Sequence, residues 1–253
     1  HQHKKENTFV AFIHDIESLR QNPNDKKKIS EELNILNHFD YLVCHNERMK
    51  KWLQTNGITS KILVLNVFDY LSPEFTFADN DTYQTINFAG NLEKSKFLKE
   101  KFTNYTLNLF GPNFREEYNV NNNCHFLGEF SPEEVPKHIK SGFGLIWDGS
   151  GIDHPSGTYG NYLKYITPHK FSLYLRSSIP VIAWSKSAIG KYITDNQLGF
   201  VIDDLSELDP KINGISLDEY LKMRVKSRKF SDKVKNGFFT KKILQQIETE
   251  CEF

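Results

Sequence analysis

Two lysines, Lys164 and Lys170, stand near the predicted start of a helix in a position that favours anion binding. Pro168 suits the first helical position, because its missing N–H would be unpaired there, and Thr167 just before it is a suitable cap. His169 and Lys170 then fall in the first turn. The helix dipole is already positive there, so a cation costs roughly 0.3–1 kcal/mol.

A bound anion would remove this conflict, because the free N–H groups of the first turn and Lys170 would both point at it. Lys164, six residues earlier, is placed to supply a second cation. The pattern therefore predicts a phosphate or diphosphate pocket. The alternative interpretation is that both lysines are solvated and the dipole cost is tolerated.

The predicted helix is followed by a buried strand. Ile179 to Trp184 is a short apolar run with a proline near its start, which is typical of a parallel strand covered on both faces. The helix packs through residues that recur at the spacing of one helical face: Phe171, Tyr174, Leu175 and Ser178.

Composition excludes several classes of protein. The 253 residues contain 32 Lys plus Arg and 32 Asp plus Glu, so no overall field favours nucleic acid. The three cysteines are widely spaced, which argues against a disulfide framework and for a reducing compartment. No run reaches the roughly 18 apolar residues of a membrane span, and no signal peptide is visible. We therefore expect a cytoplasmic protein.

The first 74 residues predict part of an α/β domain. Three apolar strands, Phe9 to His14, Tyr41 to His45 and Lys61 to Val67, alternate with helical segments. The chain lacks an initiator methionine, and we expect further strands upstream of its first residue. The polar stretch from Phe68 to Thr82 has lost periodicity and predicts an interdomain linker.

Residues 83–215 predict a complete doubly wound domain of six β–α units, and residues 216–253 a helical tail with a break at Asn236-Gly237. Within the doubly wound domain, Ser131 is expected to cap one helix, and residues 95–102 are expected to form another. Ligands of such sheets bind beyond the carboxyl ends of the strands. The polar groups at those ends are Gly90 and Asn91, Gly111, Gly128 to Phe130, and Asp148 with the loop after it.

Several segments resemble a family of bacterial GT-B glycosyltransferases, the glucosyltransferases that extend adhesin glycans and the β-1,6-galactofuranosyltransferases. On the donor side these segments are GNLEKSKFL, LNLFGPN, FLGEFSPEEVP, FGLIWDG and SGTYGNYLKYITPHKFSLYLRSSIPVIAW. On the acceptor side they are FIHDIESLR, CHNERMKKWL and FDYL. The resemblance covers nearly the whole chain, and the YLKY…PHK segment is its most specific part.

The resemblance implies two Rossmann-like domains that face each other across a cleft, with the last helices crossing back to the first domain. It implies a UDP-sugar donor held mainly by the second domain, with no metal required. Lys164 and Lys170 would neutralise the diphosphate, and Glu129-Phe130 would lie against the uracil. The other implied donor residues are Gly90, Asn91, Lys94, Asp148, Tyr159 and Asn161.

An inverting enzyme also needs a general base for the acceptor hydroxyl. Asp15 and His14, at the end of the first strand, are the candidates. The alternative is that His14 is a core histidine and that Asp15 caps the following helix. Asp153 and His154 beside Asp148 could suggest a metal cluster, but their spacing supplies no recognisable ligand set, so we expect a solvated loop.

The sequence thus predicts an enzyme that moves a hexose from a UDP-sugar to a saccharide acceptor on a glycoprotein or a lipid-linked glycan. A non-catalytic nucleotide-sugar-binding module, or a partner subunit, is the alternative. A sugar-nucleotide epimerase is disfavoured because no G-x-G-x-x-G fingerprint follows either first strand. The basic segment Lys222 to Lys235 could contact an anionic membrane, although an exposed helix is the simpler account. Homo-oligomerisation stays open.

Overall fold

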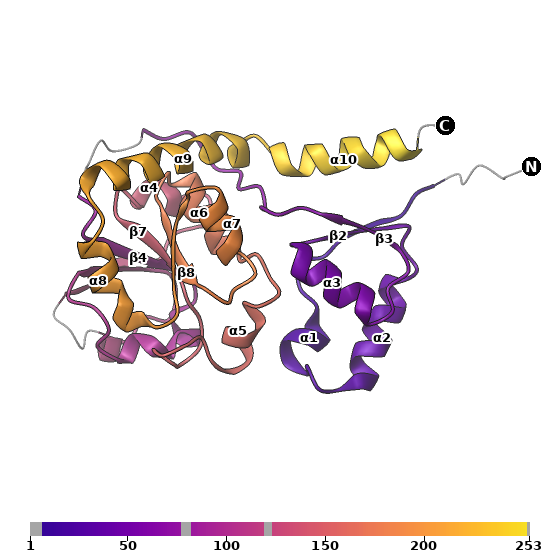
Figure 1. Cartoon of the computed structure of the whole chain (residues 1–253), viewed down its shortest axis with the longest axis horizontal. Helices are drawn as coiled ribbons and strands as arrows, with labels where there is room; N and C mark the ends of the chain where they lie inside the picture. Colours follow the sequence, from indigo (N-terminus) through magenta and orange to yellow (C-terminus); the bar gives the residue numbers. More distant parts are fainter. Residues whose placement is uncertain (1–6, 77–81, 119–122, 252–253) are drawn as a thin grey trace, which may run out of the picture.

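The computed structural model describes residues 7–76, 82–118 and 123–251. These residues form two α/β domains, each built on a parallel sheet, and the C-terminal helices run across both of them (Figure 1). The predicted two-domain architecture is confirmed.

The first domain has a three-stranded parallel sheet in the order β1-β2-β3. Its strands are β1 (Val10–Phe12), β2 (Tyr41–Cys44) and β3 (Lys61–Val64), and its helices are α1 (Glu17–Gln21), α2 (Lys26–Leu36) and α3 (Glu47–Thr55). Asp25 caps α2 and Asn46 caps α3, each by accepting two backbone N–H bonds. Alternate residues of β2 serve opposite faces, so Leu42 packs toward α2 and α3 while Val43 packs toward the C-terminal helix.

The second domain has a six-stranded parallel sheet in the order β6-β5-β4-β7-β8-β9. Its strands are β4 (Thr85–Ala89), β5 (Thr106–Phe110), β6 (Cys124–Gly128), β7 (Phe143–Ile146), β8 (Val181–Trp184) and β9 (Gly199–Ile202). This is the strand order of a doubly wound fold, which reverses direction between the first and fourth strands of the unit. The reversal therefore lies between β4 and β7.

Short helices cover both faces of this sheet. The α-helices are α4 (Val135–His138), α5 (Gly157–Tyr162), α6 (His169–Arg176), α7 (Gly190–Asp195) and α8 (Leu208–Asn213). The 3₁₀ helices are η1 (Leu92–Lys94), η2 (Lys96–Lys99), η3 (Glu116–Tyr118) and η4 (Leu205–Glu207). One face of the sheet packs on α6 through Phe171 and Tyr174, and the other buries Phe88 and Trp184.

The C-terminal helices join the two domains. The helix α9 (Leu217–Lys235) begins with a capping box between Ser216 and Glu219 and packs against α6. After the break at Asn236 and Gly237, α10 (Phe238–Cys251) crosses to the first domain and covers the face of its sheet opposite α1 to α3 (Figure 1). Lys61 on β3 forms an ion pair of 2.6 Å with Glu250 on α10.

The predicted linker is held to the second domain and to the tail wherever it is described. The Arg176 guanidinium donates to Ser72 and to the Pro73 carbonyl oxygen. The Asp69 carboxylate accepts the N–H groups of Phe239 and Thr240 at the start of α10. Residues 77–81 lie outside the described part of the chain.

The predicted start of α6 was wrong in one respect. Pro168, with extended backbone, is the residue before the helix, and no side chain caps it. Thr167 is used in a long-range contact instead, because its N–H donates to His45 Nδ1 at 3.0 Å. Ser178 lies outside the helix with a φ of 58°. A left-handed backbone at this position lets the chain turn into β8.

Three other local predictions also need correction. Residues 131–134 form a turn in which the Ser131 carbonyl, and not its hydroxyl, accepts bonds from Glu134 and Val135, and α4 begins only at Val135. The helix expected over residues 95–102 is the short 3₁₀ helix η2. The loop expected after Asp148 runs into the helix α5, which its irregular sequence did not predict.

Candidate functional site

A cavity of about 220 Å³ lies where the sheet of the second domain reverses its order and faces the first domain. Asn91 and Lys94 follow β4, and Asp148 follows β7, so the strands on both sides of the reversal contribute to it. Open α/β sheets bind ligands at this place. The lining residues are Asp15, Arg20, Asn91, Lys94, Asp148, Tyr159, Tyr162, Ile166 and Lys170. We call this cavity the switch-point pocket.

Lys170 is held firmly inside the switch-point pocket. Its ammonium lies 2.7 Å from Asp148 Oδ1, and both side chains are less than a fifth exposed. The ammonium also lies 4.3 Å from the centre of the Phe88 ring. Gly90 has a φ of 146°, and a Cβ there would be 2.9 Å from Lys170 Cε. The glycine therefore leaves the space that the lysine stem occupies.

The charge at the start of α6 is offset by protein groups. Burial and repulsion from His14 lower the pKa of His169, so its ring carries no charge at neutral pH. The remaining cation, Lys170, is paired with the Asp148 carboxylate. The dipole conflict noted in the sequence is thus relieved by Asp148, and it does not by itself demand a bound anion.

Lys164 lies in a neighbouring cavity and not in the switch-point pocket. Its ammonium contacts Asn161 Oδ1 at 3.2 Å and sits 5.6 Å from the centre of the Trp184 ring. Lys94 shares the switch-point pocket with Lys170 and lies 4.6 Å from the centre of the Tyr159 ring. The position expected for Lys164 is therefore occupied by Lys94, while the ligand roles of all these residues stay predictions.

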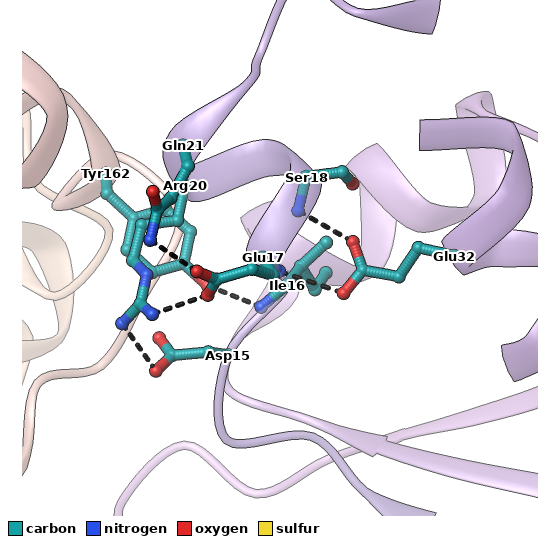
Figure 2. Close-up of polar contacts among 8 residues, drawn as sticks. All are labelled: Asp15, Ile16, Glu17, Ser18, Arg20, Gln21, Glu32 and Tyr162. Carbon is teal, nitrogen blue, oxygen red and sulfur yellow. Dashed lines mark hydrogen bonds and ion pairs between the residues drawn. The ribbon is translucent and has the colours of Figure 1, made fainter. Parts of the chain in front are cut away.

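The first domain contributes Asp15 and Arg20 to the switch-point pocket. Arg20 Nη1 lies 2.8 Å from Asp15 Oδ2, and its Nη2 pairs with Glu17 (Figure 2). Asp15 does not cap α1, because Ile16 is the cap residue and the N–H groups of Glu17 and Ser18 bond to Glu32. The capping alternative for Asp15 is therefore wrong, and its carboxylate faces the pocket.

Tyr162 connects the domains at the same place. Its hydroxyl accepts the N–H of Ile16 at 2.8 Å, although the two residues are 146 positions apart (Figure 2). Burial raises the pKa of Tyr162, so the phenol stays protonated. Arg20, Tyr162 and Ile166 were not predicted as site residues. Arg20 and Tyr162 fall in the segments FIHDIESLR and GNYLKY, but only the tertiary fold shows that they meet.

His14 lies in an aromatic cluster between the domains and not among the residues that line the switch-point pocket. Its ring stacks 5.8 Å from His169 and 5.5 Å from Phe68. His45, only 2 % exposed, packs edge-on against Phe68. Burial lowers the pKa of His45 to about 4, so its neutral Nδ1 can accept the Thr167 N–H.

Glu129 and Phe130 follow the edge strand β6 and do not line the switch-point pocket. The Phe130 ring stacks on His138 at 3.7 Å, so one of its faces is already covered. Asn91 Oδ1 accepts bonds from the Glu93 N–H and the Asn113 amide, which fixes the loop after β4. The contact of Glu129 and Phe130 with a uracil stays a prediction.

Within residues 7–76, 82–118 and 123–251, no three acidic, histidine or cysteine side chains converge on a point that could hold a metal ion. Asp153 and His154 bond to each other at 2.9 Å on the exposed loop. The expectation that transfer needs no metal stays a prediction.

Two facing Rossmann-like domains, a crossover helix and a pocket at the reversal of the second sheet define a glycosyltransferase of the GT-B class. Solved structures share this fold. Sucrose-phosphate synthase from Thermosynechococcus elongatus is 13% identical with a TM-score of 0.62, over 95% of this chain and 66% of that one. Anabaena HepE in complex with UDP is 14% identical with a TM-score of 0.60, over 96% of this chain and 72% of that one.

The chain belongs to the Glucosyltransferase 3-like family. The model of the family's N-terminal domain matches residues 1–67, and that of its C-terminal domain matches residues 86–247. The chain is 31% identical to the β-1,6-galactofuranosyltransferase WbbI of Escherichia coli K12, over 94% of this chain and 71% of that protein. It is 30% identical to Glucosyltransferase 3 of Streptococcus gordonii, over 93% of this chain and 69% of that protein. The resemblance seen in the sequence is confirmed.

Proposed function

We propose that this glycosyltransferase moves a hexose from a UDP-sugar to a hydroxyl of a saccharide acceptor, with the donor diphosphate in the switch-point pocket. The observation that carries the proposal is the convergence of Lys94 and Lys170 at the sheet reversal, opposite the Asp15 carboxylate of the other domain. The relatives are named as hexosyltransferases, and one solved neighbour is in complex with UDP.

The pocket suits the diphosphate and the sugar more than a whole nucleotide. Small-molecule sites usually measure about 300–1,000 Å³, and this pocket holds about 220 Å³. The uridine would therefore extend along the carboxyl ends of β5 and β6, in the direction of Glu129 and Phe130. In this proposal the nucleotide is bound by the loops that directly follow β4, β6 and β7.

Charge movement explains how these residues would accelerate transfer. The bond between the anomeric carbon and the diphosphate oxygen breaks, and negative charge grows on the leaving UDP. Lys170, which now neutralises Asp148, would turn to the diphosphate and stabilise that charge, with Lys94 on its other side. The acceptor oxygen forms the new bond to the anomeric carbon, and its proton passes to Asp15 as general base.

Calorimetry with UDP tests the donor site. Lys170→Ala should weaken UDP binding by at least tenfold, because a charge-assisted contact to phosphate is lost. Lys191→Ala is the matched control, since Lys191 is also paired with an aspartate, Asp195, but on the exposed surface. Equal UDP affinity in the Lys170→Ala variant and the wild type would contradict the assignment. UDP release from UDP-glucose and UDP-galactofuranose with an acceptor panel then separates an enzyme from a binding module.

The cysteines and the helices bear on the compartment in which the reaction takes place. Cys44, Cys124 and Cys251 are free thiols, in keeping with the reducing cytoplasm that we propose as the compartment. No helix among the described residues is both long and apolar enough to cross a bilayer. Contact of α9 with a membrane surface and self-association of the chain stay predictions.

A further inference from the structure

A second and larger cavity lies directly beside the switch-point pocket. It measures about 430 Å³, within the usual range for small-molecule sites. The first domain lines one side of it and the helix α5 with the residues after it lines the other. The lining residues are Leu19, Arg20, Pro23, Asn24, Trp52, Gly157, Thr158, Asn161, Tyr162, Lys164 and Tyr165. We call it the interdomain cavity.

The interdomain cavity combines aromatic rings with uncharged hydrogen-bonding groups. Trp52 on α3 and Tyr165 are half-buried, and each packs against the core of the first domain while it lines the cavity. Asn24 from the first domain and Asn161 on α5 are both exposed at the cavity, and the Asn161 amide also donates to the Gly157 carbonyl and accepts from Lys164. A pyranose ring has apolar C–H faces and a rim of hydroxyls, so it suits flat aromatic surfaces edged by amides.

The charges of the residues that line the cavity also favour a saccharide ligand. Among the residues that the structure describes, the cations of this lining are Arg20 and Lys164, and no carboxylate lines the cavity. The Arg20 guanidinium is already paired with Asp15 and Glu17, and the Lys164 ammonium contacts the side-chain oxygen of Asn161. This lining favours a neutral or weakly acidic saccharide and gives a second nucleotide diphosphate little to bind.

The position of the interdomain cavity relates it to the reaction. Arg20 and Tyr162 line both cavities and so form their common wall. Asp15 lies on the other side of that wall and is held there by Arg20 at 2.8 Å (Figure 2). A hydroxyl that reaches past Tyr162 from the interdomain cavity would enter the switch-point pocket beside Asp15.

We propose that the interdomain cavity is the acceptor subsite, that it binds a pyranoside, and that Trp52 is the stacking platform for its ring. This proposal rests on the proposed function, because it places an acceptor next to the donor assigned there. It assigns a binding role to Trp52, a half-buried residue that also packs against the core of the first domain. The role of Asn161 and Lys164 becomes contact with the acceptor instead of the donor.

Saturation-transfer NMR with methyl pyranosides tests the proposal, because the method detects millimolar binding. The panel contains the methyl α- and β-glycosides of glucose, galactose and N-acetylglucosamine, each measured with and without UDP. We expect binding of at least one glycoside to the wild type. Trp52→Ala should weaken that binding at least fivefold and Trp52→Phe much less, while both keep wild-type UDP affinity.

A second variant keeps the test decisive if Trp52→Ala disturbs the fold. Asn24 is exposed, so Asn24→Trp should fill the interdomain cavity without loss of core packing and should abolish glycoside binding. Gln54→Trp, on an exposed position of α3 that does not line the cavity, is the matched control. Retention of glycoside binding in Asn24→Trp, or no binding of any glycoside to the wild type, would overturn the proposal.

The two proposals fail separately. Trp52-dependent glycoside binding without UDP binding would leave the acceptor subsite in place and refute the donor assignment. UDP binding that depends on Lys170, with no glycoside bound in the presence of UDP, would support the donor assignment and refute the acceptor subsite.

Discussion

The Lys170 ammonium lies 2.7 Å from the Asp148 carboxylate, so the cation proposed to hold the donor diphosphate is already paired within the protein. A ligand phosphate must therefore compete with Asp148 for Lys170, and it also meets the repulsion of that carboxylate. Donor binding at this site is an exchange of partners. The position of Asp148 at the end of β7 and of Lys170 in the first turn of α6 makes this exchange a property of the fold.

Replacing Asp148 by Asn should tighten UDP binding. The neutral amide keeps the shape of the side chain but removes both the competition for Lys170 and the repulsion of the diphosphate. We expect the dissociation constant of UDP to fall roughly three- to tenfold, which corresponds to about 0.6–1.4 kcal/mol. Calorimetry measures it. Asp195→Asn, which removes the partner of exposed Lys191, should leave it unchanged. Weaker UDP binding in Asp148→Asn would show that Asp148 supports the donor and does not compete with it.

Replacing Gly90 by Ala should disturb Lys170 directly. A Cβ at position 90 would lie 2.9 Å from Lys170 Cε, and the φ of 146° disfavours any side chain. We expect a loss of roughly 1–3 kcal/mol in the free energy of unfolding and at least a threefold loss of UDP affinity. Gly57→Ala is the control, because Gly57 also has positive φ, at 101°, but no heavy atom of the described part of the chain lies within 4 Å of its added Cβ. Both variants introduce backbone strain, but only Gly90→Ala places a new atom against Lys170. A lower UDP affinity in Gly90→Ala than in Gly57→Ala would therefore come from that contact, and equal affinities would contradict it.

The stability of the protein should decrease below neutral pH because of His45. Burial lowers the pKa of His45 to about 4 in the folded chain, whereas it is about 6.5 in an unfolded chain. Between these values the unfolded state binds the extra proton, so stability is full above pH 6.5 and is lost as pH falls toward 4. The full loss is on the order of 3 kcal/mol and is reached only below pH 4. Urea unfolding at pH 7 and pH 5 should show about 2 kcal/mol of it.

His45→Asn is the matched variant for the pH experiment. Asparagine can still accept the Thr167 N–H through its side-chain oxygen but does not titrate. Its stability should therefore change less between pH 7 and pH 5 than that of the wild type. A wild type and a variant with the same difference between the two pH values would show that other groups carry the pH dependence.

Local sequence patterns predicted the parts of the fold that depend on neighbouring residues. The predicted bounds of α3 and β4 agree with the structure, because Asn46 caps the helix and β4 is a short apolar run closed by Gly90. The break between α9 and α10 was also predicted at Asn236 and Gly237. The start of α6 failed because Thr167 bonds to His45, which is 122 positions away, and no local pattern contains that contact.

The site was predicted in part for the same reason. The end of a strand can be recognised from the neighbouring residues alone. Asn91, Asp148 and Asp15 were therefore predicted as site residues, and all three line the switch-point pocket. Lys164 was placed by its distance in sequence from Lys170, but the intervening turn after α5 sends its side chain to the interdomain cavity. Arg20 and Trp52 reach the cavities from the other domain, and only the packing of the domains reveals them.

Tyr162→Phe should loosen the contact between the domains. The Tyr162 hydroxyl accepts the Ile16 N–H at 2.8 Å in a buried position, so its removal leaves that donor without this bond. We expect the free energy of unfolding to fall by about 1–3 kcal/mol, with UDP affinity changed less than twofold, because Lys94 and Lys170 stay in place. Chemical unfolding and calorimetry on the same samples measure both quantities, and Tyr165→Phe controls for loss of a tyrosine hydroxyl nearby.

Since Ile16 follows Asp15, a fall in the rate of transfer with unchanged UDP affinity is also expected. A tenfold loss of UDP affinity would instead place the Tyr162 hydroxyl in the donor site.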